Sequence, residues 1–300
     1  MPLPFLFPLI MAQTDVSGMI SPYVSDLPPE IVEKKAEQDR KRREQEAMNV
    51  TLPSPQPKVG CMGAVEANPA RSAEVARDAL KEAVGRERVR AGLCLGVALS
   101  DLGQWDEARE TFIGARDAAE VDDHASRARL GEMAGNAALA ANEPGQALSV
   151  LAPAASDAQA AGDKVLIAAI AIDRARALVA VKQPDEAASA LAQAREAVPD
   201  SAQAWLLSAT LSRRQKNLIT AQTQIEKAAQ LAPQDPEVGL EAGVIAMLSG
   251  NETAARRSWN SVLAMAPESD AAATARQYIA QLGPETSAQK APVQKPSSKP

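Results

Sequence analysis

The chain has 300 residues, with 38 acidic and 32 basic side chains and a formal net charge of −6. Aromatic residues make up only 3% of it, whereas 62 residues are alanine, the best helix former and a poor strand former. This composition excludes an all-β fold. The acidic balance argues against a nucleic-acid-binding protein, which needs a basic surface to displace counterions.

The first twelve residues, MPLPFLFPLIMA, are apolar and end at Ala12 before a polar segment. They are similar to the apolar core and cleavage site of a secretory signal, although the basic residues that usually precede such a core are missing. We interpret residues 1–12 as a signal peptide and predict a periplasmic or secreted protein. The alternative is an ordinary apolar N-terminus on a cytoplasmic protein. No apolar run reaches the ~20 residues of a membrane-spanning helix, so we expect no transmembrane segment.

Residues 13–69 are predicted to hold a charged helix and a proline-rich linker. Six acidic and six basic residues lie between Glu30 and Glu46, and they leave almost no apolar stripe to bury. Three prolines then follow between residues 50 and 60. At the other end, residues 284–300 are rich in proline, serine, glutamine and lysine, a composition that predicts a disordered tail.

The intervening segment repeats itself, because four columns of residues recur every 34 positions. The columns are Pro199, Pro233 and Pro267; Ala187, Ala221 and Ala255; Ala175, Ala209 and Gly243; and Ala194, Ala228 and Val262. Within each unit the apolar residues are three to four apart on either side of a short turn, which predicts two helices closed by a proline. Small residues such as Ala209 and Ala221 should face each other where the two helix axes are closest.

These units resemble tetratricopeptide repeats, which place a bulky and a small residue in helix A, a small, a bulky and a small residue in helix B, and a proline at the end. The unit from Ala202 supplies Trp205, Ala209, Ala221, Ile225, Ala228 and Pro233; the unit from Pro236 supplies Gly243, Ala255, Trp259, Val262 and Pro267; and the unit from Ala168 supplies Ala175, Ala187, Ala190, Ala194 and Pro199, with Ala190 at the bulky position. Two earlier units supply Gly96, Leu99, Gly103, Trp105, Ala108, Phe112 and Ala115, and Gly135, Ala138, Ala147, Leu151 and Ala154.

The resemblance covers about residues 89–269. It implies an all-α fold, a right-handed superhelical solenoid of antiparallel helix pairs, over residues 70–283. Flanking helices are expected at residues 72–84 and 271–282, the second capped by Asp270. The two earlier units are 39 and 40 residues long, so we expect either a longer helix B or longer connections in them.

The resemblance also implies that certain helix A positions line a concave groove that binds peptides. The groove candidates in this chain are Asn136, Ile172, Arg176, Leu206, Thr210, Arg213, Arg214 and Val244. Arginine forks suit carboxylates, so these arginines beside apolar residues predict a peptide or protein ligand with acidic character and apolar anchors. The alternative is that the leucine and valine residues simply pack within their own repeats.

The two cysteines, Cys61 and Cys94, do not form a CxxC motif, which disfavours zinc and thioredoxin-like chemistry. In an exported protein they can form a disulfide. The alternative is a buried, inert Cys94 and a free Cys61 in a loop.

The search for catalytic chemistry finds little. None of the patterns GxGxxG, GxxxxGK[ST], GxSxG and HExxH occurs, and the single histidine, His124, has no second histidine to share a metal ion. We therefore predict no cofactor, no metal site and no enzyme activity. The predicted function is a scaffold for protein–protein interaction, in a bacterial-type envelope assembly if the chain is exported. The alternatives are a structural module that oligomerises through the charged helix, and an enzyme whose site is not recognisable.

Overall fold

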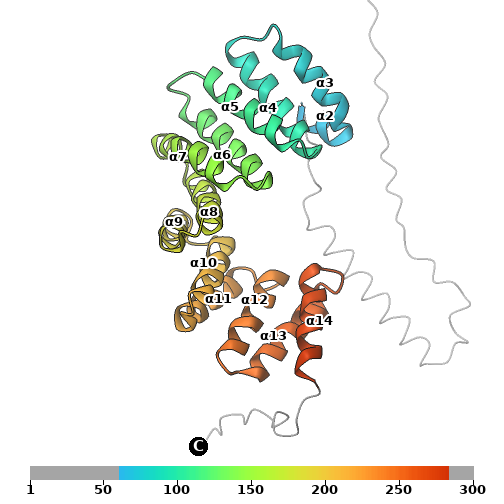
Figure 1. Ribbon diagram of the computed structural model, residues 1–300, viewed down its shortest axis with the longest axis vertical. Helices are drawn as coiled ribbons and strands as arrows, with labels where there is room; N and C mark the ends of the chain where they lie inside the picture. The colour runs from blue at the N-terminus through green and yellow to red at the C-terminus, as the bar shows by residue number, and fades with distance from the viewer. Residues whose placement is uncertain (1–60, 284–300) are drawn as a thin grey trace, which may run out of the picture. The chain divides into compact units, whose positions relative to one another are not determined.

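The computed structural model describes residues 61–283 (Figure 1). Over this range the chain forms thirteen helices and no strand, which confirms the predicted all-α solenoid of antiparallel helix pairs. The predicted signal peptide, the charged helix, the linker up to residue 60 and the tail from residue 284 lie outside the described residues. None of the helices between residues 61 and 283 combines the length and the apolarity that crossing a membrane requires.

Ten of the helices form five pairs, each with a helix A followed by a helix B, and each pair packs on the next (Figure 1). The pairs are α4 (Gly85–Asp101) with α5 (Trp105–Ala118), α6 (His124–Ala140) with α7 (Pro144–Ala161), α8 (Lys164–Ala180) with α9 (Pro184–Ala197), α10 (Ala202–Arg214) with α11 (Leu218–Leu231), and α12 (Pro236–Leu248) with α13 (Glu252–Met265).

The turn from helix A to helix B uses the same backbone conformation in all five pairs. One residue in each turn has a positive φ: Gly103, Asn142, Lys182, Lys216 and Gly250. Glycine and asparagine tolerate this left-handed region well, so in three of the five turns the residue at this position itself favours the observed conformation. The two lysines adopt it because the packing of the helices on both sides fixes the turn.

A small residue on helix A meets a bulky residue on helix B at the centre of each pair. Glycine stands opposite the bulky residue in three pairs: Gly96 opposite Phe112, Gly135 opposite Leu151, and Gly243 opposite Trp259. In the other two pairs Ala175 shares a buried cluster with Leu191, and Ala209 shares one with Ile225. The bulky residue of the third pair is therefore Leu191, which is 2% exposed, and the assignment of Ala190 to this position was wrong.

The two longer periods, from Ala108 to Ala147 and from Ala147 to Ala187, owe their length mainly to helices α6, α7 and α8 rather than to connections. Helices α6 and α8 have 17 residues each where α10 and α12 have 13, and α7 has 18 where α11 and α13 have 14. Helix A is thus about one turn longer in the first three pairs, where α4 also has 17 residues, and helix B is longer only in the second pair, since α5 and α9 have 14.

The last turns of α7 carry a buried carboxylate that joins three elements. Asp157 is 8% exposed and accepts a hydrogen bond from Arg116 at 2.7 Å. The Nδ1 atom of His124 lies 3.0 Å from Asp157, and Arg127 lies 3.6 Å from it. Burial by itself would raise the pKa of Asp157, but the hydrogen bonds from His124 and Arg116 and the arginine charges outweigh it and lower the pKa. The lengthened helices are therefore held together by a charged cluster as well as by apolar packing.

Two helices precede the array. Helix α3 (Pro69–Leu80) begins before the predicted residue 72, because the Asn68 side chain caps it by accepting a hydrogen bond from the backbone N–H of Arg71 at 2.9 Å. Helix α2 (Cys61–Ala67) lies inside the segment predicted to be a linker. Its Val65 side chain is buried in the first core cluster, so the packed part of the chain extends further toward the N-terminus than the sequence indicates.

One helix follows the array. Helix α14 (Asp270–Leu282) is capped by Ser269, one residue before the predicted cap, since the Ser269 hydroxyl accepts a hydrogen bond from the N–H of Ala272 at 3.1 Å. Gly283 ends it at a positive φ of 73°. Its buried alanines cover the apolar side of the last pair, including Trp259.

The structure pairs Cys61 with Cys94 in a disulfide, with the two Cα atoms 5.6 Å apart. This bond joins the short helix α2 to α4 across 33 positions of sequence.

Candidate functional site

A cavity of about 220 Å³ lies between α8, α9 and α10, and we call it the α8–α10 groove. Its lining residues are Ala175, Arg176, Val179, Leu191, Leu207, Thr210, Leu211 and Arg214. The lining is mostly aliphatic, with one hydroxyl and two guanidinium groups. Three of the predicted groove residues, Arg176, Thr210 and Arg214, are brought together here.

The spacing of the lining residues explains why they share one wall. On α10, Leu207, Thr210, Leu211 and Arg214 follow at i, i+3, i+4 and i+7, which is a single face of a helix. Leu207 and Leu211 were not among the predicted groove residues. The same helical periodicity, counted from Thr210 and Arg214, would have identified them.

The two arginines of the α8–α10 groove differ in how far their charges are satisfied. Arg176 donates a hydrogen bond to Asp173 at 2.8 Å, and its own side chain is 44% exposed. Arg214 is exposed, and no hydrogen bond or ion pair joins it to any residue between 61 and 283. Among the described residues, the groove therefore presents one arginine without a partner, Arg214, and one, Arg176, that is paired with Asp173 only.

Two interacting carboxylates lie on the neighbouring A helices α6 and α8, and one of them, Asp173, pairs with Arg176. Burial raises the pKa of Asp173, although the charge of Arg176 and hydrogen bonds from Arg176 and Asn136 act in the opposite direction. Burial also raises the pKa of Glu132, and the negative charge of Asp173 adds to this effect. Asn136, a predicted groove residue, is therefore engaged with these carboxylates on α6 and α8 and does not line the α8–α10 groove.

Arg213 does not present the free charge that the sequence suggested. Its Nε donates to Oε1 of Glu241 at 2.6 Å, and its Nη2 donates to Oε2 at 3.1 Å. Both side chains are largely buried, with exposures of 23% and 11%. This bidentate ion pair compensates the charge of Arg213 and links α10 to α12. Arg213 is thus a structural residue between two A helices.

The three apolar candidates serve mainly in packing. Ile172 is buried in the same cluster as Ala175 and Leu191. Leu206 packs against the cluster that contains Ile225, and Val244 packs against the one that contains Trp259. The alternative raised from the sequence was packing within the residues' own repeats, and the clusters here also include residues of the neighbouring helix pairs and α14.

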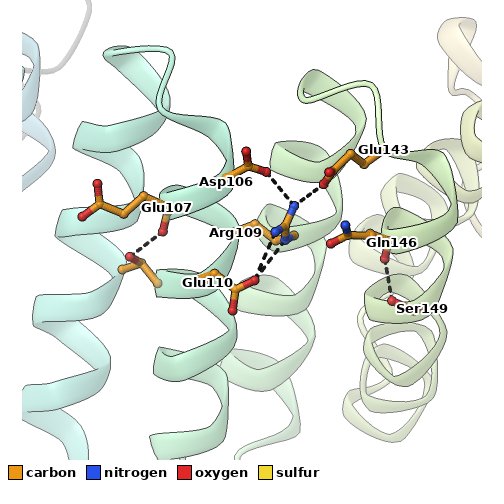
Figure 2. A network of polar contacts seen from close by, with 8 residues as sticks. Asp106, Glu107, Arg109, Glu110, Glu143, Gln146 and Ser149 are labelled. Atoms are coloured by element: carbon orange, nitrogen blue, oxygen red, sulfur yellow. Dashed lines mark hydrogen bonds and ion pairs between the residues drawn. The ribbon is translucent and has the colours of Figure 1, made fainter.

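A second group of charges surrounds Arg109 at the B helices of the first two pairs (Figure 2). Arg109 on α5 lies between Asp106 at 2.9 Å and Glu110 at 3.1 Å, and it also contacts Glu143, which caps α7. Burial would lower the pKa of Arg109, but the surrounding carboxylates outweigh it and raise the pKa. These contacts join the B helix of the first pair to the start of the B helix of the second and compensate the buried charge of Arg109.

The described part of the chain holds no group of three or more histidine, cysteine, aspartate or glutamate side chains placed to bind a metal ion. His124 is engaged with Asp157 instead.

Comparison with known proteins agrees with this architecture. The tetratricopeptide-repeat family model matches residues 168–211, which span α8, α9 and most of α10. The chain therefore contains a tetratricopeptide repeat in this segment. No curated protein matches the sequence.

Three solved structures share the fold at low sequence identity. PilF of Pseudomonas aeruginosa has a TM-score of 0.57 at 15% identity, covering 74% of this chain and 94% of its own. PilW, a widely conserved type IV pilus biogenesis factor, has a TM-score of 0.56 at 18% identity, covering 71% and 94%. BtubC from P. vanneervenii has a TM-score of 0.55 at 14% identity, covering 81% and 98%.

Proposed function

We propose that this protein is a non-catalytic scaffold that binds an acidic peptide segment of a partner protein in the α8–α10 groove. The observation that carries the proposal is an aliphatic cavity flanked by Arg176 and by Arg214, whose charge has no partner among the described residues. An isolated cation beside an apolar recess does little for folding. It does suit a ligand that offers a carboxylate next to an aliphatic side chain.

The size and shape of the groove limit the ligand. A cavity of about 220 Å³ is below the range of sites for small-molecule cofactors, which begin at roughly 300 Å³. It accommodates one or two aliphatic side chains. The partner segment therefore contributes a short apolar anchor, with aspartate, glutamate or a terminal carboxylate placed to reach Arg214 and the open side of Arg176.

We also propose that the protein acts outside the cytoplasm, in an assembly of the cell envelope. Two features of the chain support this: the apolar segment at residues 1–12 and the Cys61–Cys94 disulfide, which persists in oxidising compartments. PilW offers an example of the same fold in a type IV pilus biogenesis factor. In a reducing compartment the two thiols would remain free.

The peptide proposal can be tested without knowing the natural partner. Peptides selected against the oxidised full chain from a displayed random library should combine acidic residues with a nearby aliphatic residue. The dissociation constant of the best peptide should rise at least about tenfold in Arg176→Glu/Arg214→Glu, equivalent to about 1.4 kcal/mol. Its salt dependence should also become weaker.

Arg257→Glu is the matched control, since Arg257 is an exposed arginine on α13 with no ion pair to another described residue. It should bind the peptide like the wild type, and circular dichroism should show the same helix content for all three proteins. If the selected peptides lack acidic residues, or bind the double variant as well as the wild type, the α8–α10 groove is not the binding site.

A further inference from the structure

A second and larger cavity, of about 870 Å³, lies far from the α8–α10 groove in sequence, between α2, α3 and α4. We call it the N-terminal groove. Small apolar side chains from all three helices line it, among them Val75, Ala79, Ala83 and Ala91, and the Cys61–Cys94 disulfide lies in its wall. Val75 is 55% exposed, which is unusual for an aliphatic residue within an apolar recess.

The groove exists because α2 is short. Helix α3 packs on α4 as a helix B packs on the next helix A, and α2 packs on both of them in the place of a preceding helix A. The A helices of the array have 13 to 17 residues, whereas α2 has seven. The helices between residues 61 and 283 therefore cover only part of the face along α3 and α4 that a full helix A would bury.

The uncovered side of α3 has opposite charges at its two ends. Arg71, Val75, Ala79 and Glu82 follow at intervals of four, four and three residues, so they lie along one side of α3 and the turn after it. Arg71 pairs only with its neighbour Glu74, at 2.9 Å, where both side chains are at least 65% exposed. Glu82 has no ion pair to another residue in the described range. The two other charges on the groove wall, Glu87 and Arg90, neutralise each other at 2.8 Å.

We propose that the N-terminal groove is the contact surface between two copies of this chain related by a twofold axis. A surface that is positive at one end, apolar in the middle and negative at the other end is complementary to itself when reversed. In a twofold pair the two α3 helices run antiparallel, and the axis passes between Val75 and Ala79. Arg71 of each copy then meets Glu82 of the other, so the same favourable contact forms twice.

The apolar middle provides the remaining stabilisation. Val75 enters the recess of the opposite copy, and the alanines on either side allow the helix backbones to approach closely. The contact comprises about two helices from each copy, which is at the small end of stable interfaces, so the dimer should dissociate in the micromolar to millimolar range.

The test is the oligomeric state of the oxidised full chain, measured by sedimentation velocity from about 1 µM to 1 mM. The wild type should form a concentration-dependent dimer. Arg71→Glu and Glu82→Arg should each raise the dissociation constant at least about tenfold, because the twofold axis turns one reversed charge into two repulsive contacts. An equimolar mixture of the two variants should recover the wild-type affinity, since each contact then joins opposite charges again.

Arg257→Glu serves as the control and should dimerise like the wild type. Ala79→Glu provides a second variant, because it places a carboxylate at the axis and should also weaken the dimer. A wild type that is monomeric throughout, a dimer that ignores these substitutions, or a mixture that fails to recover affinity would each overturn the proposal. Arg71 and Glu82 lie outside the α8–α10 groove, so peptide binding in these variants should stay unchanged, and the two proposals fail or succeed independently.

Discussion

The contact between Gly243 and Trp259 provides the sharpest test of how the helix pairs pack. A Cβ atom added at Gly243 would lie 2.1 Å from Nε1 of Trp259 and 2.4 Å from its Cδ1. The indole cannot move away freely, because its Nε1 donates to the carbonyl of Leu240 at 3.2 Å and the Tyr278 ring packs against it, tilted by 46° with ring centroids 5.2 Å apart. We therefore expect Gly243→Ala to destabilise the last pair.

The magnitude follows from three contributions. Heavy atoms in contact normally lie about 3.5–4.0 Å apart, so the indole must move by more than 1 Å. Overpacking of this kind costs about 1–3 kcal/mol, and losing the hydrogen bond to Leu240 costs about 1 kcal/mol more. Alanine recovers about 1 kcal/mol over glycine through helix propensity. The net loss should be about 2 kcal/mol, a fall of about 4–8 °C in Tm for a domain of this size.

Urea and thermal unfolding followed by circular dichroism will measure this loss, and the chain supplies its own control. Gly114 lies within α5, and a Cβ there would meet nothing within 4 Å, so Gly114→Ala should stabilise the protein by about 0.5–1 kcal/mol. Combining Gly243→Ala with Trp259→Leu should cost less than the sum of the two single changes, because it recreates the pairing of Ala175 with Leu191. A Gly243→Ala protein as stable as Gly114→Ala would refute the small-to-bulky packing argument.

Two further features of the structure give predictions of their own. Reduction of the Cys61–Cys94 disulfide, or Cys61→Ala/Cys94→Ala, should lower the stability by about 3–4 kcal/mol for a loop of this length; mass spectrometry that finds two free thiols in protein recovered from an oxidising compartment would contradict the disulfide. Asp157→Asn should cost about 3 kcal/mol, because it leaves the charges of Arg116 and Arg127 buried without their counterion. Because folding lowers the pKa of Asp157, its contribution to folding stability depends on pH. The full contribution is present above the ordinary pKa of an aspartate, and it is lost as the pH falls through the lower pKa of the folded state. The free energy of unfolding should therefore fall less steeply with decreasing pH in Asp157→Asn than in the wild type over that interval. Equal slopes would show that Asp157 does not contribute to the acid sensitivity of the fold.

The repeat could be predicted from the sequence because its strongest signal comes from positions where packing restricts the size of the side chain. Ala187, Ala221 and Ala255 are completely buried where the helix axes are closest, and no larger side chain fits there. The same abundance of alanine obscured the bulky position of the third pair, where Ala190 and Leu191 are adjacent. The spacing from Ala221 to Ile225 would have pointed to Leu191, four residues after its own alanine.

The N-terminal helix α2 could not be predicted from local signals. Seven residues are too few to show a helical period, and an isolated helix of that length is unstable in water. It forms because Val65 packs against the core beneath α3 and because Cys61 is bonded to α4. Both contacts are tertiary, so the sequence around α2 reads as part of the linker that precedes it.

The candidate site was predicted only in part, and the reason lies in contacts between repeats. The family resemblance placed Arg176, Thr210 and Arg214 in one groove, and the three residues line the same cavity between two A helices. It could not separate Arg213 from Arg214, since both lie at the end of α10 and both read as groove cations. The two arginines differ in the residue that the next helix A places 28 positions later. Arg213 finds the carboxylate of Glu241 there, whereas the corresponding residue for Arg214 is Ala242, which offers no charge.

This distinction can be tested by crossing two substitutions. Glu241→Gln removes the charge that compensates Arg213 and should destabilise the protein by about 1–3 kcal/mol, because a charged hydrogen-bonded pair in a largely buried position is broken. Peptide binding in the α8–α10 groove should stay at the wild-type level, since neither residue lines it. Arg214→Glu should do the reverse, weakening peptide binding at least about tenfold while leaving the unfolding transition in place. If Glu241→Gln weakens the peptide as much as Arg214→Glu does, the pair between α10 and α12 belongs to the binding surface, and the division between structural and binding arginines fails.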